Sequence, residues 1–92
     1  TTIGAIITNG KFDKTKLNKI ASMTHNGYAR SINPVHTMAD GDSIYALSVG
    51  EVEADLNTVG TLSARVMSMA IENAIKSAES MYGLTAYKDL KF

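Results

Sequence analysis

Three residues of this 92-residue chain, Thr1, Asp40 and Asp42, could together carry out acyl transfer. A threonine with a free α-amine is a self-contained catalytic unit, because its hydroxyl is the nucleophile and its own amine is the base. The ordinary pKa of that amine, roughly 7.7–8, suits proton transfer near neutral pH. This chemistry requires threonine as the first residue. A chain that starts with Thr1-Thr2 rather than Met is expected to be processed, although a trimmed terminus or a tag remnant would start in the same way.

Asp40 and Asp42 flank Gly41 directly before an apolar stretch of the chain. Alternate residues of an extended chain point to the same side, so both carboxylates could face one site. If the strand that follows lies beside the strand that starts after Thr1, one carboxylate could orient the amine or the hydroxyl of Thr1. Asp-Gly-Asp is also an ordinary turn sequence, and most such turns are structural.

The two histidines, His25 and His36, are too few for an all-histidine metal site. His36 lies in the segment before Asp40 and could lie near the site, but a loop histidine more often satisfies a backbone carbonyl group. The four tyrosines are expected to be packing residues with polar tips. The sequence contains no phosphate-binding glycine loop, no nucleophile-elbow serine and no His-Glu-x-x-His motif. We therefore expect neither a metal nor a cofactor.

The composition argues against several classes of function. Lys+Arg and Asp+Glu both number nine, so the net charge is zero and the basic face of a nucleic-acid-binding protein is not expected. No apolar run approaches the ~18–20 residues of a membrane span. The chain has no cysteine for a disulfide, a thiolate metal site or a nucleophile, which is compatible with a reducing compartment. We expect a cytoplasmic protein without a nucleic-acid or membrane partner.

The first half of the chain predicts a strand and a helix that position these residues. Residues 3–7 are continuously apolar up to the turn pair Asn9-Gly10, which is typical of a strand buried on both faces. Gly4 within it suggests close approach by another backbone or a ligand. Asp13 is expected to cap a helix that runs to about Arg30. Its predicted buried face contains Leu17, Ile20, Ala21, Thr24, Gly27 and Tyr28.

The second half predicts a loop, a second strand and a long helix. The loop covers residues 32–42, and the strand covers residues 43–49 and stops at Gly50. The helix is expected from residue 56 or 57 to Tyr82, with Asn57 or Thr58 as N-cap and Gly83 as C-cap, followed by a tail over residues 83–92. Apolar residues cover most of this helix, so it must be buried on more than one side. Two strands are also too few for a stable sheet. We therefore expect a β-α-β-α chain of the α/β (α+β) class that completes a sheet supplied by another chain.

Three blocks, residues 1–9 (TTIGAIITN), 23–37 (MTHNGYARSINPVHT) and 40–47 (DGDSIYAL), resemble one family. It is the self-cleaving peptidase family of the D-aminopeptidases (L-aminopeptidase/D-esterases), β-aminopeptidases and nylon-oligomer (6-aminohexanoate oligomer) hydrolases. The resemblance covers roughly residues 1–82. In that family an inactive precursor cuts itself before a Ser or Thr, which makes a larger α subunit and a small β subunit. The new terminal residue is the nucleophile.

The resemblance implies that residues 1–92 are a β subunit, part of one αβ domain. It implies that Thr1 is the catalytic nucleophile and that Asp40 and Asp42 are the acidic pair that assists it. It also implies a four-layer α-β-β-α sandwich completed by a missing α subunit, which would carry the oxyanion-stabilising groups and most of the substrate pocket. A small amide or oligoamide substrate is expected, and no cofactor. The apolar second helix further predicts an assembly of several αβ units.

The choice of activity within the family rests on the acidic pair. Some aminopeptidases carry a Ser and a Glu in that region, so Asp40 and Asp42 together with a threonine nucleophile favour the nylon-oligomer hydrolases. The alternative within the family is a β- or D-aminopeptidase or esterase. Acetyl transfer in arginine biosynthesis, by enzymes that also cleave themselves to a terminal threonine, fits the motifs less well. A non-catalytic interaction subunit, in which Thr1 is accidental, is the alternative of another class.

Overall fold

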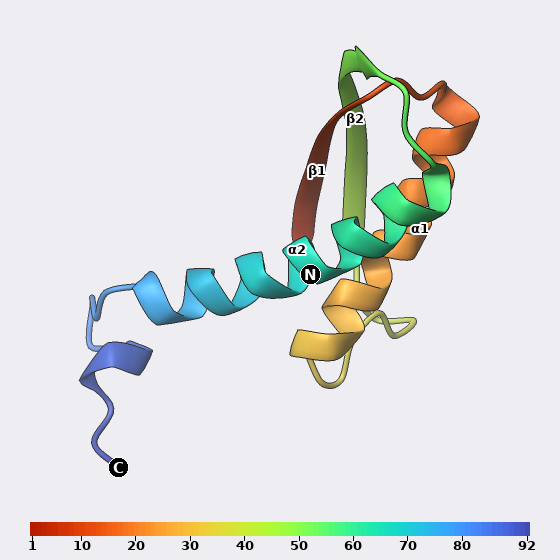
Figure 1. The fold of residues 1–92 in the computed structure, drawn as a ribbon. Coiled ribbons are helices and arrows are strands. Elements are labelled where there is room, and N and C mark those ends of the chain that lie inside the picture. The colour runs from red at the N-terminus through yellow and green to blue at the C-terminus, as the bar shows by residue number, and fades with distance from the viewer.

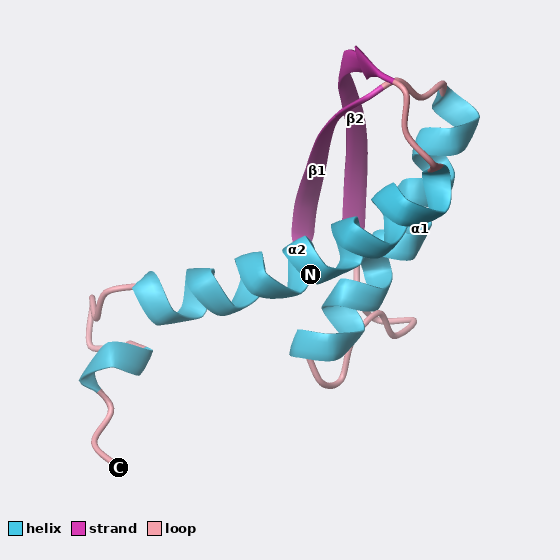
Figure 2. Cartoon of the chain, viewed as in Figure 1, coloured by secondary structure: helices cyan, strands magenta, loops and turns pink.

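A computed structural model describes all 92 residues as a small α+β domain (Figures 1 and 2). The order of elements is β1 (Ile3–Gly10), α1 (Lys14–Ser31), β2 (Ser43–Val52), α2 (Leu56–Ser77) and a 3-10 helix, η1 (Tyr87–Asp89). This order confirms the predicted β-α-β-α chain of the α+β class. The strands form a two-stranded parallel sheet in which Ile3 is paired with Ser43. Because the strands are parallel and start in register, the residues that precede β1 and β2 lie at the same edge of the sheet.

One face of the sheet packs against the helices and the other is open. Ile6 of β1 is buried, whereas Ile3 and Ile7, on the opposite side of the strand, are 71% and 63% exposed. In β2, Tyr45 and Val49 are likewise exposed. The prediction that the first strand is buried on both faces is therefore wrong for this chain alone, since the chain supplies helices to only one face.

The start of α1 is as the sequence predicts. The side chain of Asp13 accepts a hydrogen bond of 2.9 Å from the backbone N–H of Lys16, which satisfies an amide that would otherwise have no partner in the helix. The predicted buried face is also confirmed at four positions and is half-buried at the other two. The buried residues are Ile20, Thr24, Gly27 and Tyr28.

The boundaries of β2 and α2 differ from the predictions. β2 continues through Gly50 to Val52, because the register shifts between Thr8 and Gly10 of β1 and the ladder then resumes. A side chain at Gly50 would meet the backbone of Asn9, so the glycine permits the close strand contact rather than ending the strand. The N-cap of α2 is Asp55, whose carboxylate accepts from the N–H of Thr58 at 2.9 Å, and not the predicted Asn57 or Thr58.

The end of α2 also differs from its prediction. The helix stops at Ser77, five residues before Tyr82, and Ala78 is extended. Beyond it, the hydroxyl of Ser80 accepts from the N–H of Ala86 at 2.7 Å and donates to Asp89, which holds a compact turn in place of more helix. Gly83, with φ of 79°, lies in the tight connection between Met81 and Leu84 and is not the C-cap.

The core is small and lies where α1 crosses α2 and the sheet. Ile20 and Tyr28 are fully buried, and Gly27 lets α2 approach so closely that a side chain there would clash with the carbonyl oxygen of Ala64. The second half of α2 projects away from this core (Figure 1). We call residues 72–92 the distal arm; all of them are exposed except Ala86. Neither helix is long and apolar enough to cross a membrane.

Candidate active site

The predicted residues Thr1, Asp40 and Asp42 lie together at the edge of the sheet where both strands start. The backbone N–H of Ser43 donates to the carbonyl oxygen of Thr2 at 2.9 Å, which joins the start of β2 to the start of β1. The condition that the second strand lies beside the first is therefore met. We call Thr1, Thr2, Asp40, Asp42 and Tyr28 the site corner.

Thr1 faces the turn formed by residues 40–42. Its terminal ammonium donates to Asp40 Oδ1 at 3.3 Å, and the two side chains are 56% and 30% exposed. A β carbon at Gly41 would lie 3.1 Å from Thr1 Oγ1, so the hydroxyl lies directly against this turn. Asp40 is also 3.3 Å from the hydroxyl of Thr37, which donates to its second oxygen. The hydroxyl and the amine of Thr1 thus both lie beside the Asp-Gly-Asp turn, and the side chain of Thr1 is more than half exposed.

Asp42 contacts the backbone on both sides of the site. Its Oδ1 accepts from the N–H of Thr2 at 2.7 Å, and its Oδ2 accepts from the N–H of His36 at 2.8 Å. Burial raises the pKa of the Asp42 carboxyl, but these two hydrogen bonds, the terminal ammonium and His36 outweigh burial, so the pKa lies below its ordinary value. Asp42 is therefore a carboxylate that fixes the chain next to Thr1, whereas Asp40 holds the amine. The two acidic residues do different things.

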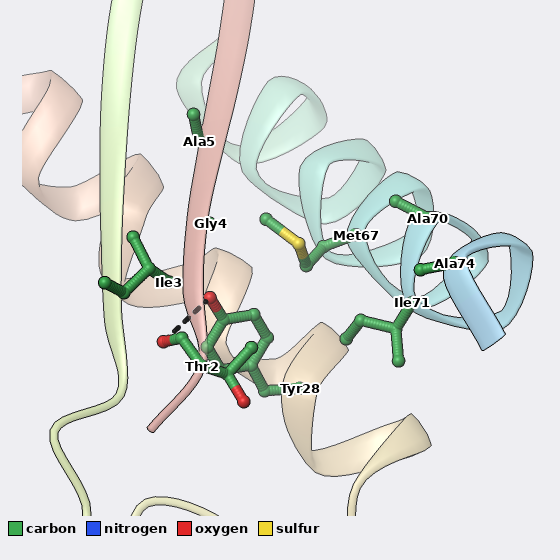
Figure 3. Close-up of a pocket in the computed structure, with 9 residues that line it drawn as sticks. All are labelled: Thr2, Ile3, Gly4, Ala5, Tyr28, Met67, Ala70, Ile71 and Ala74. Carbon is green, nitrogen blue, oxygen red and sulfur yellow. Dashed lines mark hydrogen bonds between the residues drawn. The ribbon is translucent and has the colours of Figure 1, made fainter. Parts of the chain in front are cut away.

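Within the site corner, Tyr28 contacts the starts of both strands. Its ring is fully buried, its hydroxyl donates to the carbonyl oxygen of Ser43 at 3.0 Å, and the same hydroxyl lies 3.5 Å from the carbonyl oxygen of Thr2 (Figure 3). Burial raises the pKa of the phenol, which keeps it a neutral donor. A β carbon at Gly4 would lie 2.6 Å from this hydroxyl and 2.8 Å from Met67 Cε. Within this chain the close approach at Gly4 is thus made by two side chains, whereas the sequence predicts another backbone or a ligand there. Sequence reasoning assigned Tyr28 to packing and missed its bond to both strand starts.

The two histidines form a stacked pair beside Asp42. Their ring centroids are 4.5 Å apart with an interplanar angle of 29°, and His25 also meets the ring of Tyr28 edge-on at 5.2 Å. His36 lies near the site, as the sequence suggested, but the contact is its backbone N–H to Asp42 and not a carbonyl group. His36 has a φ of 51°, which is uncommon outside glycine. His25 Nδ1 is buried without a hydrogen-bond partner. The three-residue spacing of His25 and Tyr28 on α1 was the only signal for this cluster.

An open groove of about 290 Å³ lies between β1 and α2. Figure 3 shows its lining, which is mostly apolar: Thr2, Ile3, Gly4, Ala5, Tyr28, Met67, Ala70, Ile71 and Ala74. Neither Asp40 nor Asp42 lines it. No group of three or more potential ligands in the chain is arranged to hold a metal ion.

Comparison with known proteins gives a consistent result. The model of peptidase family S58 matches residues 1–88. The chain is 31% identical over 98% of its length to an uncharacterized aminopeptidase of Mycobacterium tuberculosis (strain ATCC 25618 / H37Rv), covering 30% of that protein. It is 30% identical over 95% of its length to one of Mycobacterium leprae (strain TN), covering 28% of it. It is 33% identical over 89% of its length to a 6-aminohexanoate-oligomer endohydrolase of Paenarthrobacter ureafaciens, covering 23% of it. The chain thus spans under a third of each relative, and no solved structure matches it.

Proposed function

We propose, since this chain belongs to peptidase family S58, that it is the small subunit of an amide hydrolase with Thr1 as its nucleophile. The observation that carries the proposal is the placement of the Thr1 amine and hydroxyl against the Asp40–Asp42 turn. A hydroxyl, an amine that can accept its proton and an acceptor that orients the amine are the parts that a self-contained nucleophile needs.

The proposed reaction is acyl transfer in two steps. Thr1 Oγ1 attacks the amide carbonyl carbon while the Thr1 amine takes the hydroxyl proton, and the same proton is delivered to the leaving amine. Water then attacks the acyl ester, and the amine again carries the proton. Asp40 accepts from the amine and orients it, and Asp42 holds the backbone of Thr2 so that the nucleophile stays in position. The oxyanion would be stabilised by donors of the larger subunit.

The larger subunit is proposed to come from the same precursor. The relatives are more than three times as long as the matched region, so most of their length lies outside this chain. One sheet face and several large apolar residues of α2, among them Leu62 and Val66 at 52% exposure, have no cover within the chain. An α subunit that adds strands and a second layer pair would bury them and complete the four-layer sandwich. Several such αβ units would then assemble further.

A 6-aminohexanoate oligomer is the substrate class that we favour. The curated relatives that bear the name 6-aminohexanoate-oligomer endohydrolase reach 33% identity, and a pair of aspartates beside a threonine supports the same choice. The second candidate is aminopeptidase activity, because the mycobacterial relatives with that name match up to 98% of the chain. Both candidates use the same chemistry at Thr1 and differ in the part of the substrate that the unseen pocket holds.

The test is made on the precursor and on the assembled enzyme. Thr1→Ala should abolish both self-cleavage and hydrolysis, whereas Thr1→Ser, which keeps a hydroxyl, should retain part of both. Terminal sequencing of the wild-type small subunit should return Thr1 as a free residue. Turnover is measured with a 6-aminohexanoate oligomer and with a β-alanyl amide, which separates the two substrate classes. Appreciable turnover by Thr1→Ala, or a blocked or extended terminus in the active enzyme, would remove Thr1 from the nucleophile role.

A further inference from the structure

The loop that carries both aspartates is linked to α1 through two histidine rings. His36 lies midway along residues 32–42, and its backbone N–H holds one oxygen of Asp42 at 2.8 Å while the other oxygen holds Thr2 at 2.7 Å. The ring of the same residue lies on His25 with the centroids 4.5 Å apart. A movement of His36 would therefore remove one of the two hydrogen bonds that fix Asp42 beside the start of β1.

The surroundings of His25 favour its uncharged ring. His25 Nδ1 is buried and has no acceptor, so a proton placed on that nitrogen would be buried without a partner. Burial lowers the pKa of His25, and the nearby charge of His36 lowers it further, while Asp42 raises it. The neighbours that face the pair are Tyr28 on α1, Asp42 before β2 and, through Asp42, the ammonium of Thr1. No charged group of α2 is among those that shift the pKa of His25.

We propose that His25 and His36 are positioning residues that hold Asp42 in place for Thr1, and that protonation of the buried Nδ1 of His25 switches the site off in acid. The inference rests on the proposed function of Thr1. A proton on His25 Nδ1 would be buried without an acceptor, so the charged ring is expected to move toward water. Because the ring of His36 lies on that of His25, this movement shifts His36 and releases one oxygen of Asp42.

The proposal predicts an unusual acid limb in the pH–rate profile. Protonation of the Thr1 amine alone gives a limb of slope one in log(kcat/KM) against pH. The pKa of His25 lies below its ordinary 6.5, so its protonation adds a second proton to the limb below that pH, and the limb steepens toward a slope of two. At pH 5 the wild-type value should therefore lie below the line extrapolated from pH 7.

The experiment compares ring variants of the assembled enzyme on β-alanyl p-nitroanilide and on a 6-aminohexanoate oligomer. His25→Phe keeps an aromatic ring in the stack without a titrating group, and its limb should keep slope one down to pH 5. His25→Ala removes the ring, and its kcat at pH 8 should fall about fivefold or more below that of His25→Phe, with a smaller change in KM. His36→Asn tolerates the positive φ and removes the ring that lies on His25, so its limb should likewise keep slope one. A slope of two in either His25→Phe or His36→Asn, as in the wild type, overturns the proposal.

A measurement of thermal stability does not depend on turnover, so it tests this inference separately from the function of Thr1 on which it rests. The melting temperature of the assembled protein should fall less between pH 8 and pH 5 in His25→Phe than in the wild type. An equal fall in both proteins overturns the role of the stack, whatever the activity. Conversely, an active Thr1→Ala enzyme contradicts the function of Thr1, while the melting comparison still tests the histidines.

Discussion

The site corner and the distal arm belong to the same chain, but the corner is hydrogen-bonded and packed whereas the arm is exposed. In the corner, Asp42 accepts two backbone N–H groups and the hydroxyl of Tyr28 contacts both strand starts. Ile20, on the same helix as Tyr28, is fully buried. In the arm, Ile75 is 59% exposed and Phe92 is fully exposed. The contrast indicates that this chain fixes the surroundings of Thr1 by itself, whereas the position of the arm depends on apolar burial that this chain alone does not provide.

The first prediction compares isoleucine-to-alanine substitutions in the core and in the distal arm, and the core variant should show the largest loss of stability. Ile20→Ala should lower the free energy of unfolding by about 2–5 kcal/mol, because it leaves a cavity in a packed core. Ile75→Ala should lower the free energy of unfolding of the subunit by less than about 1 kcal/mol, because the side chain of Ile75 is already half exposed. Denaturant unfolding of the assembled protein at two concentrations measures both.

Unfolding at two protein concentrations shows whether any further loss of stability in Ile75→Ala comes from weaker association. If a partner covers the arm, that cost should shrink as the protein concentration rises, since it reflects lost association. An equal and concentration-independent cost for both variants would contradict the contrast between corner and arm. Ile20→Val is the matched control in the core, and it should cost only about 0.5–1.5 kcal/mol.

The corner was more predictable from sequence than the arm, for a physical reason. Thr1, Asp40 and Asp42 could be placed together because local patterns fix two strands and their order, and parallel strands that pair bring their starts to one edge. Asp13 was predicted as a cap because capping is decided within four residues. The stack of His25 on His36 was missed, since it joins a helix to an irregular loop and no periodicity encodes it.

The arm was mispredicted where tertiary contacts overrule local preference. The apolar pattern of α2 continues past Ser77, so periodicity extends the helix to Tyr82, but the hydroxyl of Ser80 and the carboxylate of Asp89 favour a turn instead. Glycine is common at helix C-caps, so the sequence predicts that role for Gly83. Gly83 does have a positive φ, but in a turn and not at the end of a helix.

The second prediction tests whether Asp42 organises the corner. Asp42→Asn should lower kcat at least about tenfold, because an amide accepts more weakly and cannot satisfy both N–H groups with a full negative charge. KM should change less, since the contacts are to the backbone of the chain itself. Steady-state kinetics of the assembled enzyme give both constants. A fully active Asp42→Asn enzyme would show that the corner does not depend on this carboxylate.

The third prediction is that acid weakens the corner in two steps. The pKa of His25 in the folded protein lies below its ordinary 6.5, so its contribution to stability is present above pH 6.5 and is lost as the pH falls through that value toward the folded pKa. The pKa of Asp42 lies below its ordinary 3.8, so its contribution is present above that value and is lost at lower pH. Urea unfolding between pH 3 and pH 8 should show both losses. His25→Phe should remove the first and Asp42→Asn the second; a single step unaffected by either variant would contradict this assignment.

The smallest effect is expected at Asp40, and it sharpens the difference between the two aspartates. Asp40 makes an exposed contact of 3.3 Å to the ammonium, whereas Asp42 holds two shorter bonds in a buried position. Exposed ion pairs are weak and screened by salt, so Asp40→Asn should lower kcat only about two- to fivefold. An asparagine oxygen can still accept from the amine. Salt screens the ion pair of the wild type, so the difference in kcat between Asp40→Asn and the wild type should narrow when the ionic strength rises. Kinetics of both variants at low and high salt provide the measurement. A loss at Asp40 as large as that at Asp42, and independent of salt, would mean that orienting the amine limits the reaction as strongly as fixing the backbone does.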